Sequence, residues 1–141
     1  MNYYLQNTLR CHKIINNQLN TVNKILNWLE EYDTFFNEDN YTFSAENGLI
    51  KVSSLKNVNI ANKNLESIPV FFNRVEGTFN CSNNQLKSLQ GCPKIVKLEF
   101  LCSKNKIKNF NFSPYWVGDD FLCSNNEIED LNLNCEIQGS L

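Results

Sequence analysis

The stretch Phe79–Val96, FNCSNNQLKSLQGCPKIV, decides the fold of this 141-residue chain, because the chain nearly repeats it twice. The text returns as FLCSKNKIKNFNFSPYWV from Phe100 and as FLCSNNEIEDLNL from Phe121. Several columns recur every 21 residues: Phe79/Phe100/Phe121, Cys81/Cys102/Cys123, Asn84/Asn105/Asn126, Leu86/Ile107/Ile128 and Leu89/Phe110/Leu131. Repetition at a fixed period of this length is the signature of a solenoid, in which each repeat stacks on the one before it.

A more divergent repeat, VNIANKNLESI, precedes these three and places Val58, Ile60, Leu65 and Ile68 in the same columns. The sequence therefore predicts four turns, beginning near residues 55, 76, 97 and 118. Within a turn, the segment Val96–Cys102 alternates apolar and other residues, which predicts one strand with Val96, Leu98, Phe100 and Cys102 on its buried face. The asparagine column should form a ladder, because an amide side chain both donates to and accepts from backbone groups left unpaired in the turns.

These repeats resemble the Leu-x-Leu-x-x-Asn-x-Leu core of leucine-rich repeats, with Phe and Cys in the first two aliphatic positions. They are most similar to short leucine-rich-repeat proteins of bacteriophages and some large viruses, in which a WL helix and an NYT segment precede the repeats. The matching pieces here are NWLEEY, NYTF, NKNLESIP and GTFNCSNNQLKSLQGCP, so that the resemblance covers residues 22–131. The chain departs from the pattern at Lys63, which stands where the ladder asparagine is expected in the first turn.

The resemblance implies a non-catalytic interaction scaffold, encoded by a phage, that binds and inhibits a host protein in the bacterial cytoplasm. A defence factor such as a CRISPR effector is one candidate partner. Self-assembly into a structural oligomer is the alternative function, and binding of RNA or DNA is a further alternative.

We expect an α+β chain with two parts: residues 1–47 form a helical cap or extension followed by an acidic linker, and residues 48–141 form the solenoid. The capping helix is predicted from the spacing of Val22, Ile25, Leu26 and Leu29, with Asn20 or Thr21 as its N-cap. The stretch GLIKVSS should be the first strand or a blunt first turn.

Upstream of this helix, an apolar stripe predicts either a second amphipathic helix or one long helix continuing through Leu29. Its members are Leu5, Leu9, His12, Ile15 and Leu19. The stripe packs either on the side of the solenoid or on a partner, which includes a second copy of this chain. At the other end, LNLNCEIQGSL either folds over as an irregular cap or leaves a strand edge that pairs with another chain, again with a homodimer as one outcome.

The outward positions of the strands form rows across the turns, and two rows carry large apolar residues. One row holds Arg74, Ile95, Trp116 and Ile137, and another holds Asn80, Leu101 and Leu122. We expect Trp116, Ile95, Leu101 and Leu122 to form an apolar island that binds a partner, with Trp116 as its anchor and Lys97, Glu99 and Asp120 around it. The alternative is that residues 1–19 cover this island.

Charge is segregated along the chain although the net charge is only −2. Lysines concentrate between Lys87 and Lys108, whereas residues 109–141 carry six acidic residues and no Lys or Arg. Lys104, Lys106 and Lys108 are the candidate nucleic-acid contacts, but no matched aromatic residues accompany them for base stacking, which argues against this function. No apolar run is long enough to span a membrane and the N-terminus is too polar for a signal peptide, so we expect a cytoplasmic protein.

Catalytic motifs are missing from the sequence: there is no Ser/His/Asp set, no phosphate-binding loop and no Cys-x-x-Cys pair. We therefore expect neither an enzyme nor a cofactor or metal. The cysteine column is interpreted as small apolar side chains, reduced and mostly buried, with a metal or redox role as the alternative.

Overall fold

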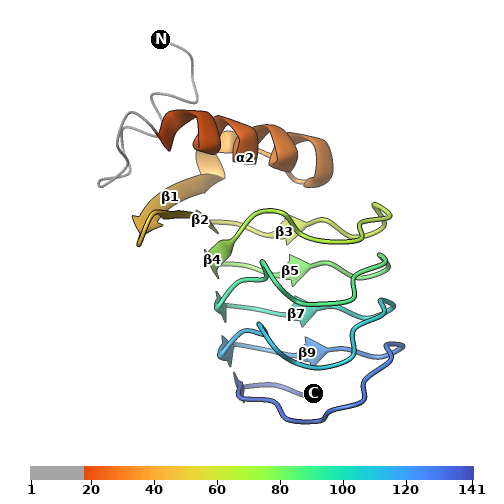
Figure 1. Ribbon diagram of the computed structural model, residues 1–141. Coiled ribbons are helices and arrows are strands. Elements are labelled where there is room, and N and C mark those ends of the chain that lie inside the picture. Colours follow the sequence, from red (N-terminus) through yellow and green to blue (C-terminus); the bar gives the residue numbers. More distant parts are fainter. Residues whose placement is uncertain (1–17) are drawn as a thin grey trace.

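The computed structural model describes residues 18–141 and shows an α+β fold, in which one helix covers the N-terminal end of a β-solenoid of about four turns (Figure 1). Helix α2, Leu19–Tyr32, buries Val22, Ile25, Leu26 and Leu29, as the spacing predicted. The expected N-cap at Asn20 or Thr21 is wrong, because Leu19 extends the apolar stripe by one position and the helix begins there. Of the predicted upstream stripe, Leu19 is half-buried, and Leu5, Leu9, His12 and Ile15 lie outside the described residues.

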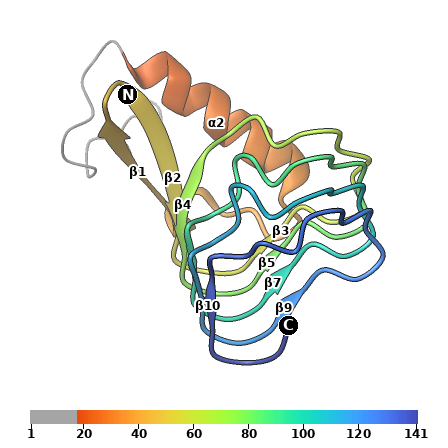
Figure 2. The same cartoon turned by 60° about the horizontal axis from the view of Figure 1, so that its bottom comes forward.

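Each turn of the solenoid contributes one strand to each of two sheets. The six-stranded sheet contains, in order, β1 Tyr41–Glu46, β2 Leu49–Ser54, β4 Phe72–Val75, β6 Ile95–Val96, β8 Trp116–Val117 and β10 Glu136–Ile137. The four-stranded sheet contains β3 Val58–Asn59, β5 Phe79–Asn80, β7 Phe100–Leu101 and β9 Phe121–Leu122. Only the β1–β2 pair is antiparallel among the described strands, since stacked turns run in the same direction. Figure 2 shows the two sheets as two sides of the coil.

The strand predicted over Val96–Cys102 is two strands separated by a corner. β6 ends at Val96 and β7 begins at Phe100, and the two belong to different sheets. Leu98, which was expected inside, lies at the corner and is 45% exposed. The alternation persists because Val96, Phe100 and Cys102 are all buried, so the bend changes the direction of the chain without changing which of them face the core.

The phenylalanine column forms the spine of the core and confirms the 21-residue register. Phe79 pairs with Phe100 and Phe100 pairs with Phe121 across the four-stranded sheet. The rings of Phe79 and Phe100 stack with their centroids 5.9 Å apart, and those of Phe100 and Phe121 meet at 4.9 Å. All three side chains are fully buried, as are Leu86 and Leu89 on the opposite wall of the turn. Continuous aromatic contact of this kind contributes to the cohesion between turns.

The asparagine ladder is confirmed by its hydrogen bonds. Asn105 Nδ2 donates to Cys81 O at 3.0 Å and to Cys102 O at 3.1 Å, and its Oδ1 accepts from Leu86 N at 3.0 Å. Asn84 accepts from both Lys63 N and Leu65 N, so the asparagine of the second turn serves the first turn, which has Lys63 in place of its own ladder residue. Each ladder residue thereby joins two turns, and at Asn84 and Asn105 the side chain that does so is buried.

Asp33, directly after α2, ties the helical cap to the solenoid. Its Oδ1 accepts from Phe35 N and from Asn59 N, both at 3.0 Å, and Tyr41 donates its hydroxyl to Oδ2. Burial raises the pKa of Tyr41, and the neighbouring Asp33 carboxylate raises it further. Within the segment interpreted as a linker, residues 41–46 form β1 of the six-stranded sheet.

The cysteine column packs as apolar side chains do. Cys81 and Cys102 are fully buried free thiols. Burial raises the pKa of the Cys102 thiol, and contact with Cys92 followed by burial raises that of Cys81. A thiol held protonated in this way is a poor nucleophile and a poor metal ligand.

Candidate binding surface

The outward row on the six-stranded sheet is set by strand pairing. Arg74 pairs with Ile95, Ile95 with Trp116, and Trp116 with Glu136. The sequence placed Ile137 in this row, which is wrong. The last turn is one residue shorter than the others, so Ile137 pairs with Val117 in the inward-facing row and packs against the core.

These residues line a shallow groove of about 370 Å³, whose lining is Arg74, Ile95, Tyr115, Trp116 and Glu136. Trp116 and Ile95 are half-buried and Tyr115 is 57% exposed. Gly118 brings the backbone of β8 close to the preceding turn, since a Cβ there would lie 1.9 Å from Lys97 O and 2.9 Å from Trp116 Cη2. The indole therefore lies against the main chain at Gly118, and the groove is preformed in the folded chain.

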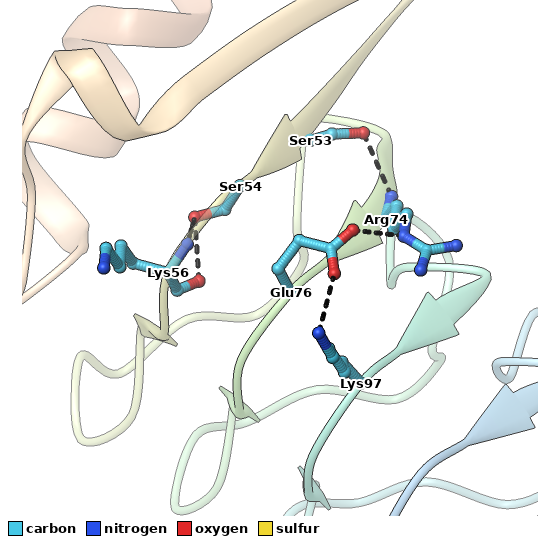
Figure 3. Close-up of polar contacts among 6 residues, drawn as sticks. All are labelled: Ser53, Ser54, Lys56, Arg74, Glu76 and Lys97. Carbon is cyan, nitrogen blue, oxygen red and sulfur yellow. Dashed lines mark hydrogen bonds and ion pairs between the residues drawn. The ribbon is translucent and has the colours of Figure 1, made fainter.

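Arg74, at one end of the groove, belongs to a network of polar contacts on the neighbouring turns (Figure 3). Arg74 donates its Nε to Glu76 Oε1, and Lys97 Nζ lies 3.9 Å from Glu76 Oε2. The backbone N–H of Arg74 donates to Ser53 Oγ at 3.1 Å, while Ser54 Oγ accepts from Lys56 N and donates to Lys56 O. Exposed ion pairs such as these add little to stability, so their main consequence is a polar rim in which Glu76 neutralises Arg74.

The predicted apolar island is divided in two by the corner between the sheets. Ile95 and Trp116 lie on the six-stranded sheet, whereas Leu101 and Leu122 pair with each other on the four-stranded sheet. Leu122 shares a separate concavity with Leu141, Cys123 and the Ser103 and Ser124 side chains. The bend at residues 97–99 separates the four apolar residues into two surfaces. The prediction of one continuous strand did not include this bend.

The three charged residues expected around the island also have separate places. Lys97 approaches Glu76, which is also the partner of Arg74 at one end of the groove. Glu99 and Asp120 lie at the corner in one column with Asn57 and Thr78. In this column the side chains of Asn57, Thr78 and Asp120 accept from the backbone of the next turn, and Glu99 N donates to Thr78 Oγ1. Asp120 Oδ1 accepts from Ser140 N at 2.8 Å, which gives this carboxylate a structural role.

The lysine band lies on exposed turns and shares no lining residue with the groove. Lys104, Lys106 and Lys108 are exposed, and Lys87 and Lys106 line a concavity together with Glu66. The next turn brings acidic residues alongside, since Glu127 N donates to Ile107 O and Glu129 N donates to Lys108 O. A basic strip bordered by carboxylates on both sides is a weak electrostatic attractant for phosphate.

The structure has a further apolar concavity that the sequence did not predict. Phe35, Leu55 and Leu98, each about half exposed, line a hollow of about 380 Å³ together with Lys56 and Glu76. No pattern in the sequence signalled it, because Phe35 lies outside the repeats and Leu98 has the parity of a core residue.

Comparison with protein families, with curated proteins and with solved structures finds no match for the chain. Within residues 18–141, no helix has the length and apolar character needed to cross a membrane. The same part of the chain contains no group of three or more metal-ligating side chains.

Proposed function

We propose that the chain is a non-catalytic protein-binding module, whose partner docks on the outward face of the six-stranded sheet with Trp116 as the anchor. The observation that carries the proposal is the groove around Trp116: a large aromatic side chain that is only half-buried in a hollow, with Ile95 and Tyr115 beside it and charged residues at its ends. Energetically dominant residues of protein interfaces are enriched in Trp, Tyr and Arg and sit in hollows of this kind.

The resemblance of the repeats to those of phage leucine-rich-repeat proteins extends this proposal to the partner. On that basis the partner is a host protein in the bacterial cytoplasm, which the chain binds and inhibits, and a defence factor such as a CRISPR effector is one candidate. The resemblance alone supports this extension.

Affinity purification with two matched variants tests the proposal. The tagged chain is expressed in bacterial cells with and without phage infection, and co-purifying proteins are quantified by mass spectrometry for wild type, Trp116→Ala and Phe35→Ala. Phe35 is the control because it is an exposed aromatic residue that lines another hollow and does not line the Trp116 groove.

We expect one stoichiometric partner that Trp116→Ala loses and Phe35→Ala retains. Retention by Trp116→Ala would exclude this surface. Recovery of the chain alone, at a mass above that of the monomer, would favour the self-assembling function instead.

A further inference from the structure

The two ends of the Trp116 groove carry different charges, and only one of them is neutralised within the molecule. At one end, Arg74 donates to the Glu76 carboxylate. At the other end, Glu136 accepts from the neutral amide of Gln138 at 3.0 Å and forms no ion pair among the described residues. The groove therefore presents one uncompensated carboxylate next to an indole.

The basic side chains nearest to Glu136 are held elsewhere. Lys94 precedes β6 and directs its Nζ over the ring of Phe112, 5.9 Å from the centroid. Lys97 approaches Glu76, as does Arg74 on β4. Strands β6 and β4 lie two and three positions from β10, which at about 4.8 Å per strand is a separation of roughly 10–14 Å, a distance over which salt screens exposed charges.

The Glu136 carboxylate also affects the thiol of Cys135, its neighbour in the sequence. Burial, and after it the Glu136 carboxylate, raises the pKa of the Cys135 thiol to about 11.

The aromatic side chains complete a site for a cation. Trp116 is the residue that pairs with Glu136 across the sheet, and Tyr115 lines the same groove. A cation is attracted to the face of an indole or phenol ring, and an adjacent carboxylate adds a charge-assisted hydrogen bond. Lys94 over Phe112 is the same kind of contact made inside the chain, by residues that precede β6 and β8.

We infer that the Trp116 groove recognises a basic side chain, arginine or lysine, presented by the protein partner, with Glu136 as its counter-ion and Trp116 and Tyr115 as its aromatic wall. This inference rests on the proposed function and names the chemistry of the partner at that surface. The Ile95 side of the groove then receives an adjacent apolar group of the same partner segment.

The test uses the full chain with small probes, so that it does not depend on knowing the partner. The indole N–H signals of Trp28 and Trp116 are assigned by NMR with a Trp28→Phe variant. Acetyl-arginine amide, acetyl-lysine amide and the neutral isostere acetyl-citrulline amide are then titrated into wild type and into Glu136→Gln. Glu129→Gln serves as the control for a general loss of acidic charge, because Glu129 is exposed and does not line the groove.

We expect a saturable shift of the Trp116 signal with a cationic probe, at least 5-fold weaker binding of the citrulline probe, and a similar weakening in Glu136→Gln but not in Glu129→Gln. Equal binding of the citrulline probe, or no effect of Glu136→Gln, would overturn the inference. If in addition the co-purified partner is lost with Trp116→Ala, the proposed function stands and only the chemistry assigned to the groove fails. If Trp116→Ala retains the partner, the proposed function itself fails.

Discussion

Replacing Asn105 by Ala should be among the most damaging single changes in the solenoid, and its cost follows mainly from the three of its hydrogen bonds that are 3.1 Å or shorter. The Leu86 N–H loses its acceptor and is left unsatisfied in a fully buried position, at a cost of about 1–3 kcal/mol. Cys81 O and Cys102 O each lose one of two donors, since Asn84 and Asn126 still donate to them, at about 0.5–1.5 kcal/mol each. The sum is a loss of about 2–6 kcal/mol in the free energy of unfolding.

Asn126→Ala is the matched control because it removes the same kinds of bond from the next rung. Asn126 is half-buried, whereas Asn105 is buried at 7% exposure, so at Asn126 water replaces part of what the alanine variant loses. We expect a cost of about 1–2 kcal/mol there. Urea unfolding followed by circular dichroism measures both, and the dependence on urea should have the same slope as in wild type. A cost below 1 kcal/mol for Asn105→Ala, or equal costs for the two variants, would refute the reasoning.

Asn105→Asp separates the donor role of the amide from its acceptor role. A carboxylate can still accept from Leu86 N, but it faces the carbonyl oxygens of Cys81 and Cys102 without a proton to donate. The folded protein therefore raises the pKa of the introduced acid above the ordinary value of about 3.9. The variant should be least stable at neutral pH, and its deficit should shrink as pH falls through that raised pKa.

Three further predictions concern single side chains. Lys104 has φ 58°, a left-handed conformation, in a column otherwise occupied by Asn62, Asn83 and Asn125. Because asparagine adopts this conformation more readily than lysine, Lys104→Asn should raise the free energy of unfolding by about 0.5–1 kcal/mol in urea denaturation. Lys106→Asn should leave it unchanged. Because Tyr41 has a pKa raised above its usual 10.0, stability should fall as pH rises above 10, and Tyr41→Phe should reduce that fall in melting temperatures measured from pH 8 to 11. Cys135, with its pKa near 11, should react slowly with iodoacetamide at pH 8, and Glu136→Gln should accelerate the reaction measured by mass spectrometry.

The solenoid could be predicted because the sequence shows both its 21-residue period and the columns of residues that face the core. Phenylalanine recurs at the same spacing as cysteine and asparagine, and each of these residues has a role that stacking requires: aromatic contact, a small buried side chain and a paired amide. The capping helix was predictable for the same reason, since its apolar stripe has helical spacing and buries one face.

The corner between the sheets could not be predicted from alternation alone. Val96, Phe100 and Cys102 keep the parity of one strand although the chain bends between the first two, and Leu98 has core parity at an exposed position. The corner divides the predicted site, because Leu101 and Leu122 lie on the other sheet. The misplaced Ile137 had a usable signal: allowing a turn of 20 residues places it with the buried valines Val75, Val96 and Val117.

Site-specific photo-crosslinking from Tyr115 tests the central claim most directly. A photoreactive amino acid is placed at position 115 or at position 35 of the full chain, where the native Tyr115 and Phe35 are 57% and 55% exposed, and the cells are illuminated before purification. The account predicts that position 115 crosslinks a partner protein and that position 35 does not. A partner captured only from position 35, or crosslinks from position 115 that join only copies of the chain itself, would contradict it.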